Sequence, residues 1–194
     1  MRRRGVLGAL VYASACSPFY AAAQPRSPVI GFLSVGSPES VGPALLGAFH
    51  KGLAEAGYHE GRNVVVEYRW AEGSYDRLAA LAADLVSRQV DVIIAGGGTV
   101  AALAARAATR TTPIVILAGD DPVRVGLVQS LNRPGGNVTG VAQLVIEVEG
   151  KRLEILRELV PRARGAAFPS NPARPGFERH RQSVEAAAHT LTSR

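Results

Sequence analysis

Three loops contain the residues that could recognise a small charged molecule. Each loop follows an apolar run that suits a buried β-strand. The candidate ligand-binding residues are Ser34, Ser37, Gly97, Gly98, Thr99, Asp120 and Asp121. Backbone N–H groups at a helix start and a threonine hydroxyl would bind an anion, and a carboxylate would pair with an ammonium group. The chemistry that these residues indicate is recognition of a small ligand.

Each candidate also has a structural interpretation, and the sequence leaves both open for the glycine loop. Its glycines could serve only the geometry of a tight turn. Thr99 is a natural N-cap of the helix that follows. Asp121 stands before Pro122, which is a usual helix start, so we expect Asp121 to be structural and leave Asp120 open.

The glycine loop also matches a dinucleotide fingerprint. Gly96-x-Gly98-x-x-Ala101 fits the pattern G-x-G-x-x-A, and Asp120 or Asp121 follows about 20 residues later. The fingerprint normally opens the first strand-to-helix turn, whereas two strand–helix units precede it here. A dinucleotide-binding oxidoreductase domain is therefore the alternative function.

Little in the sequence supports catalysis. It contains neither a Gly-x-Ser-x-Gly elbow nor a Gly-Lys-Ser/Thr phosphate loop. The spacing of His180 and His189 is not one that metal-binding histidines use. The only cysteine is Cys16. We therefore expect a protein that is not an enzyme and that has neither a cofactor nor a metal.

Strand and helix patterns alternate from residue 28 onward. The expected strands cover 29–33, 63–70, 90–95 and 113–118, and the expected helices cover 39–56, a segment from 76, 99–109 and 123–131. In the first helix every fourth residue is apolar, which predicts a buried stripe of Val41, Leu45, Phe49 and Leu53. In the second, we expect Leu78, Leu81 and Leu85 to point inward.

This order of elements predicts the fold class. Alternating strands and helices require a parallel sheet with right-handed crossovers and helices on both faces, which is a doubly wound α/β fold. Ligands of such sheets bind at the carboxyl ends of the strands, where the strand order reverses. The loops over 34–37, 96–99 and 119–122 are expected at that edge.

The pattern changes from Asn132. A turn cluster over 132–137 precedes a short strand over 138–141. An amphipathic helix over 147–160 follows, with Leu153, Leu156 and Leu159 on one face, and a last helix is expected over 177–191. We therefore expect a domain over 24–141 and, over 142–194, a crossover helix with a fragment of a second domain.

The formal net charge of +6 is concentrated at the two ends of the chain. Residues 161–194 contain six arginines and two acidic residues, and three more arginines stand at positions 2–4. Residues 24–160 contain 13 basic and 14 acidic residues. Because a nucleic-acid-binding protein needs positive charge clustered on its folded body, we expect no nucleic-acid partner.

Residues 1–23 have the pattern of an export signal. A basic start is followed by an apolar run over 5–15, which is shorter than the roughly 20 residues that span a bilayer. Small residues at Ala21 and Ala23 predict cleavage after Ala23 and a mature protein in the periplasm. The sequence leaves Sec and twin-arginine export open.

Several segments resemble one known family. They are Ile30-Gly31-Phe32-Leu33-Ser34, Gly57-Tyr58-x-Glu60-Gly61-x-Asn63, Asp91-Val92-Ile93-Ile94-Ala95, Asp121-Pro122-Val123, Arg133-Pro134-Gly135-Gly136-Asn137-Val138-Thr139-Gly140 and Lys151-Arg152-Leu153-Glu154-Ile155-Leu156. In these segments the chain resembles the ABC-transporter substrate-binding proteins whose members include binders of aromatic amino acids. The Pro-Gly-Gly-Asn-Val-Thr-Gly block is the most specific of them.

The resemblance implies a type I periplasmic-binding-protein fold, in which two hinged α/β domains close on a small solute such as an amino acid. It implies delivery of that solute to an ABC permease in the inner membrane. The family continues well past Arg194, so we expect an incomplete second domain and binding that is impaired by truncation. This chain has Gly97-Gly98-Thr99 where the family has Gly-Thr-Pro or a similar segment, which leaves the ligand contacts of that loop open.

Overall fold

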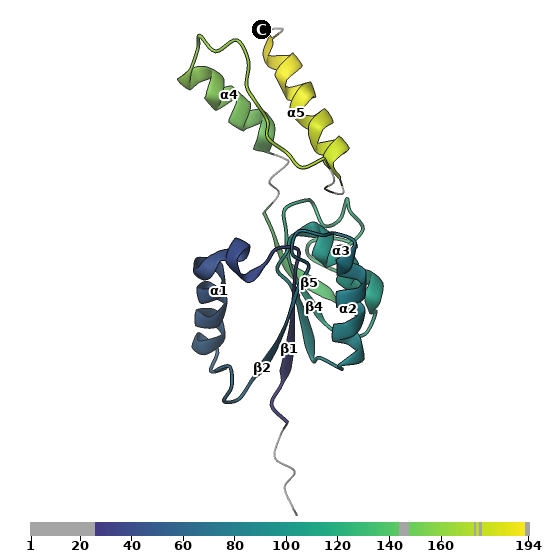
Figure 1. Ribbon diagram of the computed structural model, residues 1–194. Coiled ribbons are helices and arrows are strands. Elements are labelled where there is room, and N and C mark those ends of the chain that lie inside the picture. The colour runs from purple at the N-terminus through teal and green to yellow at the C-terminus, as the bar shows by residue number, and fades with distance from the viewer. Residues whose placement is uncertain (1–25, 144–147, 173, 175, 193–194) are drawn as a thin grey trace, which may run out of the picture.

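A single parallel sheet organises the chain. The computed structural model describes residues 26–143, 148–172, 174 and 176–192. Within them the strands follow the order β2-β1-β3-β4-β5, all parallel (Figure 1). The strands are β1 (Val29–Ser34), β2 (Val65–Trp70), β3 (Val92–Ala95), β4 (Ile114–Ala118) and β5 (Val138–Ala142). β2 and β3 each begin two residues later than the sequence predicts. The expected export signal lies outside the described residues.

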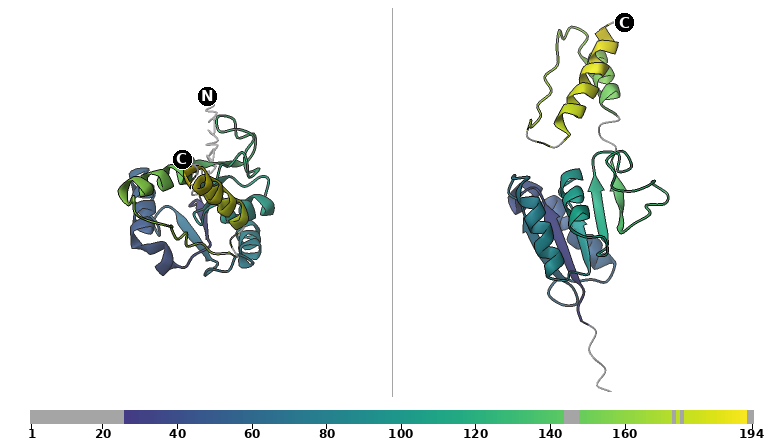
Figure 2. Two further views of the ribbon diagram at one scale, coloured as in Figure 1. Left: turned by 90° about the horizontal axis from the view of Figure 1, so that it is seen from above. Right: turned by 90° about the vertical axis from the view of Figure 1, so that its right-hand side faces the viewer.

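Helices cover both faces of this sheet, which confirms the doubly wound α/β class. They are α1 (Pro38–Glu55), α2 (Arg77–Ser87), α3 (Thr99–Ala108), α4 (Glu149–Leu159) and α5 (Phe177–Thr192). In Figure 1, α1 stands on one side of the strands and α2 with α3 on the other. Helices α4 and α5 pack on each other beyond the carboxyl ends of the strands (Figure 2). Among the described residues, no helix has both the length and the apolar character that a bilayer crossing requires.

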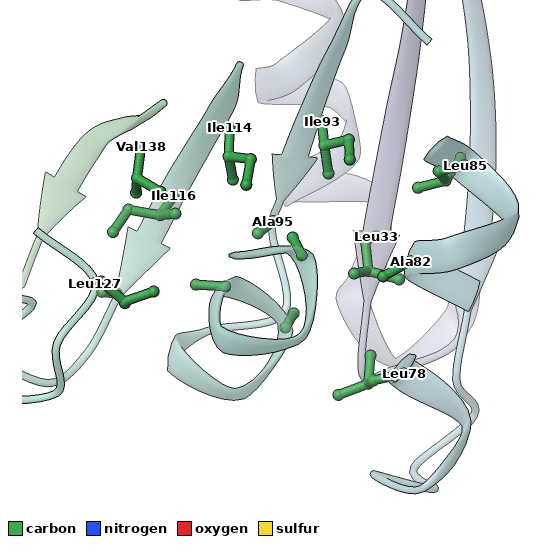
Figure 3. Close-up of a cluster of buried hydrophobic side chains, with 14 of the residues drawn as sticks. Leu33, Leu78, Ala82, Leu85, Ile93, Ala95, Ile114, Ile116, Leu127 and Val138 are labelled. Atoms are coloured by element: carbon green, nitrogen blue, oxygen red, sulfur yellow. The ribbon is translucent and has the colours of Figure 1, made fainter. Parts of the chain in front are cut away.

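The core lies between the sheet and the α2–α3 face. Leu33 and Ile93 project from the sheet toward Leu78 and Leu85 of α2, and all four side chains are at most 1% exposed (Figure 3). The inward positions predicted for Leu78 and Leu85 are therefore confirmed, and Leu81 is partly buried. This packing fixes the position of α2 and α3 relative to the carboxyl ends of the strands.

Helix α1 differs from its prediction. Among its described residues none is buried, and Leu45 is 44% exposed. Gly42 has a φ of +77° and Pro43 follows it, so a kink separates the first turn from the rest of the helix. The predicted buried stripe over Val41, Leu45, Phe49 and Leu53 is wrong: the kink separates Val41 from the other three, Leu45 is exposed, and the rest are only half-buried.

Aromatic side chains connect α1 to the sheet. The Phe49 ring lies 5.3 Å from the Phe32 ring, and the Tyr68 ring stacks on Trp70 at 5.8 Å with an interplanar angle of 4°. The Tyr68 hydroxyl donates to Glu60 at 3.3 Å. Burial, and then the charge of Glu60, raise the pKa of Tyr68 to about 12. The phenol therefore stays protonated and keeps its donor role at neutral pH.

The segment after β4 also differs from its prediction. Residues 123–126 form turns and residues 127–131 have no regular secondary structure, so the predicted helix is absent there. The backbone N–H groups of Val125 and Leu127 donate to the carbonyls of Asp121 and Pro122, which closes a single turn. Gly126 has a φ of +74°, a left-handed conformation that ends any helix at that point.

The C-terminal helices leave apolar surface exposed. Leu156 is 43% exposed and Leu159 is 75% exposed, although the sequence gives both to one apolar face of α4. β5 ends at Ala142 and α4 begins at Glu149, and residues 144–147 lie outside the described residues. The domain boundary that we place between residues 141 and 142 stays a prediction.

Candidate ligand-binding site

The loops after β1, β3 and β4 meet at one edge of the sheet. The strand order reverses between β1 and β3, which is where ligands of open α/β sheets bind. The backbone of Gly97 lies directly against the loop after β1: a Cβ on Gly97 would be 2.4 Å from the Val35 nitrogen and 2.9 Å from the Ser34 Cα. Two of the three predicted loops are thus in backbone contact.

The other two glycines of the loop also have structural functions. A Cβ on Gly96 would lie 2.7 Å from the Phe32 ring. Gly98 has a φ of +81° and is the N-cap of α3, so Thr99 is the first helical residue. The prediction of Thr99 as N-cap is therefore wrong, because the left-handed turn at Gly98 takes that position.

Thr99 instead joins the second and third loops. Its hydroxyl oxygen accepts a hydrogen bond from the Asp120 backbone N–H at 3.3 Å, and both residues are buried. This bond fixes the Asp120 backbone relative to the N-terminus of α3. The two loops therefore present their polar groups as one unit.

The side chains of three predicted site residues accept hydrogen bonds from nearby backbone N–H groups. The Ser34 hydroxyl accepts from the Gly36 N–H at 3.2 Å. Ser37 caps α1 through reciprocal bonds with Ser40. Asp121 accepts from the Val123 N–H at 2.9 Å, which is the capping geometry of its structural interpretation. A ligand role for these three residues stays a prediction.

A pocket of about 260 Å³ opens at this edge. Its lining residues are Val35, Tyr75, Gly97, Gly98, Thr99, Val100, Leu117, Gly119, Gln143 and Arg174. Three apolar side chains and one tyrosine line it together with the polar side chains of Thr99, Gln143 and Arg174, and the N-terminus of α3 contributes backbone donors. This combination suits a small ligand with an apolar body and a charged end.

Tyr75, Gln143 and Arg174 also line the pocket, although none of them is among the predicted site residues. Tyr75 lies in the loop after β2, which is also a carboxyl-end loop and could have been included by the same rule. Gln143 follows β5, and its N–H donates to the Ala118 carbonyl. Arg174 precedes α5, far from the sheet along the chain, and no local pattern places it at the site.

Arg174 contacts the one predicted residue that has an unassigned carboxylate. Its Nη2 lies 3.5 Å from Oδ2 of Asp120. The Asp120 side chain is 12% exposed and that of Arg174 is 33% exposed. A partly buried ion pair therefore connects the loop after β4 to the segment before α5, and of its two residues Arg174 is the one that lines the pocket.

Comparisons of the sequence with known proteins agree on one family. The family model described as ABC transporter substrate binding protein matches residues 41–191. A tyrosine-binding protein of Clostridioides difficile (strain R20291) is 37% identical over 116 residues, which are 60% of this chain and 33% of that protein.

Solved structures agree with this family. A conserved domain protein from Vibrio cholerae has a TM-score of 0.75 at 27% identity, and the match covers 86% of this chain and 55% of that one. The ABC domain in complex with L-Trp from Streptococcus pneumonia has a TM-score of 0.71 at 25% identity, with 85% and 54% covered. An open, ligand-free substrate-binding protein with adhesive properties from Clostridium difficile has a TM-score of 0.62 at 28% identity, with 84% and 54% covered.

The chain spans about a third of the length of its curated relative and just over half of each of these solved chains. The family match extends over most of the chain, including α2, α3, β3–β5 and α4. The type I periplasmic-binding-protein fold that the resemblance implies is borne out by these neighbours. The chain belongs to the family of ABC transporter substrate-binding proteins.

Proposed function

We propose that this chain binds an amino acid with an apolar or aromatic side chain and serves an ABC-type uptake system. The observation that carries the proposal is the pocket at the carboxyl ends of β1, β3 and β4. Val35, Val100 and Leu117 offer an apolar surface and Tyr75 an aromatic one. The N-terminus of α3 and Arg174 line the pocket and offer positive charge for the carboxylate of an amino acid. The tyrosine-binding relative and the neighbour in complex with L-Trp support the same ligand class.

We expect L-tyrosine or L-tryptophan to bind this chain saturably in calorimetric titration. The dissociation constant should lie above roughly 1 μM, which corresponds to about −8 kcal/mol. The physical reason is the one-sided lining, because nine of the ten lining residues precede residue 144 and only Arg174 faces them from the α4–α5 side. A bound amino acid should also raise the melting temperature by mass action. Absence of both effects at millimolar amino acid would contradict the proposed ligand class.

The dinucleotide alternative is tested in the same titration. Contacts with Phe32 and with the loop after β1 account for Gly96 and Gly97 without any nucleotide, and the N-cap turn accounts for Gly98. We therefore expect NAD(H) not to bind. Micromolar NAD(H) binding that is lost in Gly98→Val would favour the oxidoreductase alternative instead.

We propose further that the chain is exported and works in the periplasm with a permease of the inner membrane. The support is the N-terminal pattern of basic, apolar and small residues together with the family. We expect the exported protein to begin at Gln24, because Ala21 and Ala23 occupy the small positions that signal peptidase requires. Mass spectrometry of the N-terminal peptide measures this directly. A lipid-modified Cys16 at the N-terminus would contradict the cleavage site.

A further inference from the structure

We propose that the carboxyl end of α4 and the turn after it dock on a membrane surface that contains anionic lipid. The docking surface, which we call the α4 tip, consists of three apolar and three basic residues: Leu156, Leu159, Val160, Arg157, Arg162 and Arg164. It lies at the end of the α4–α5 pair farthest from the sheet (Figures 1 and 2). The inference goes beyond the proposed binding of a solute and does not depend on it.

The apolar side chains of the α4 tip are open to solvent. The exposed fractions are 43% for Leu156, 49% for Val160 and 75% for Leu159. Beside them lies a groove of about 180 Å³, whose lining includes Leu156, Val160 and, from α5, Leu191. Apolar side chains that project from a helix end in this way gain free energy when they enter the acyl boundary of a bilayer.

The charges around these side chains favour an anionic bilayer as the occupant. Residues 159–176 contain three arginines and no acidic residue. Arg162 and Arg164 are exposed, and within the part of the chain that the structure describes neither forms an ion pair. Glu158 is the one acidic residue next to this segment. Free guanidinium groups beside exposed apolar side chains suit the phosphate groups and the acyl chains of a bilayer at the same time.

The helix ends at the α4 tip would by themselves oppose the approach of an anion. The carboxyl end of a helix has a partial negative charge, and Val160 at the end of α4 lines the same groove as Leu191 near the end of α5. Arg157 offsets this charge at α5, because its Nη1 donates a hydrogen bond to the Leu191 carbonyl. Arg162 and Arg164 are therefore the cations that remain for an external anion.

A nucleic acid is the other polyanion that arginines could bind, and the surface fits it less well. Its phosphates would require a basic stripe over the folded body, whereas residues 24–160 contain 13 basic and 14 acidic residues. A phosphate backbone in water also gives Leu159 no apolar partner. A bilayer accounts for the charge and for the exposed leucine in one contact.

The test is co-sedimentation of the chain from Gln24 with lipid vesicles. Residues 1–23 are left out because they are themselves basic and apolar, and the described fold begins at residue 26. One vesicle contains equal parts of phosphatidylglycerol and phosphatidylcholine, and the other contains phosphatidylcholine alone. Each is measured at about 0.1 M and at about 1 M salt, between which the screening length falls from about 10 Å to about 3 Å.

The test variants are the double substitution Arg162→Gln with Arg164→Gln, and Leu159→Ala. The matched control is Arg62→Gln with Arg110→Gln. Its two arginines belong to the sheet-bearing part of the chain, are also exposed, and form no ion pair among the described residues. Both double variants therefore lose the same net charge, and only their position differs.

We expect the unmodified chain to bind phosphatidylglycerol vesicles at least about tenfold more tightly than phosphatidylcholine vesicles at low salt, and to lose this preference at high salt. Loss of Arg162 and Arg164 should weaken binding by about tenfold or more, because each cation near an anionic surface contributes a factor of about five. Leu159→Ala should weaken it by about threefold. The matched control should change binding by less than about twofold.

Fluorescence locates the contact. With Trp70→Phe as background, Leu159→Trp should shift its emission to the blue on phosphatidylglycerol vesicles. Leu131→Trp should show no shift, because Leu131 is 63% exposed but belongs to the sheet-bearing part of the chain.

Four outcomes would overturn the inference: no sedimentation with either vesicle, equal binding to both vesicles, equal loss of binding in the two double variants, or binding of a single-stranded oligonucleotide in place of vesicles. Melting temperatures verify that every variant folds. Titration with L-tyrosine should give the same dissociation constant for the unmodified chain and for the Arg162 and Arg164 double variant, so that failure of membrane docking and failure of solute binding are separate results.

Discussion

Gly97→Ala is expected to destabilise the protein by about 3 kcal/mol and to distort the pocket, because overpacking against atoms that cannot rotate away is costly. The new Cβ would lie 2.4 Å from the Val35 nitrogen and 2.9 Å from the Ser34 Cα, and both contacts are backbone atoms. The loops after β1 and β3 would have to separate to accommodate the methyl group. In a chain of this size the loss corresponds to a fall in melting temperature of roughly 6–12 °C.

Gly136→Ala is the matched control for this prediction. No described atom lies within 4 Å of the position that its Cβ would occupy, and its φ is not positive. Its melting temperature should stay close to that of the unmodified chain, within the change that about 0.5 kcal/mol produces. Equal melting temperatures for Gly97→Ala and Gly136→Ala would show that the two loops are not in the close contact described here.

Leu85→Ala should cost about 2–5 kcal/mol of unfolding free energy, the usual range for a fully buried leucine. The Leu85 side chain is 0% exposed and fills the space between α2 and the glycine of β1: a Cβ on Gly31 would lie 2.9 Å from Leu85 Cδ2. Truncation leaves a cavity that the sheet backbone cannot close. Urea unfolding followed by circular dichroism measures the loss.

The control for the core prediction is Leu159→Ala. Leu159 is 75% exposed on α4, so the same chemical change removes little buried surface and should alter stability by no more than about 0.5 kcal/mol. A loss for Leu159→Ala as large as that for Leu85→Ala would mean that the α4 face is covered in solution. The core would then extend beyond the α2–α3 side of the sheet.

The sheet could be predicted because its first strand is an apolar run, and five of the six residues of β1 are buried. Apolar runs such as those of β1 and β3 have few other stable environments in a chain of this composition, and their alternation with helices fixes the parallel topology. The same rule located the glycine loop and Asp120 at the carboxyl edge. Local sequence was therefore sufficient to predict where the strands end and which loops follow them.

The incorrect predictions concern segments whose structure depends on the backbone conformation of a single residue or on a contact with a residue distant in the sequence. Gly42 and Gly126 adopt positive φ values: the first kinks α1, and the second ends the turn after β4, where side-chain periodicity alone would predict continuous helix. Arg174 reaches the pocket only through tertiary structure, across more than fifty residues from Asp120. Propensity and spacing carry no information about such a pairing, so Arg174 could not be predicted as a residue of the pocket.

The stacking of Tyr68 on Trp70 has a spectroscopic consequence. Trp70 is the only tryptophan of the chain, so its fluorescence originates from one place, the end of β2 beneath α1. Its emission therefore reports the environment on the α1 face of the sheet, whereas circular dichroism averages over every helix. Comparison of the two signals during unfolding distinguishes loss of α1 docking from collapse of the α2–α3 core.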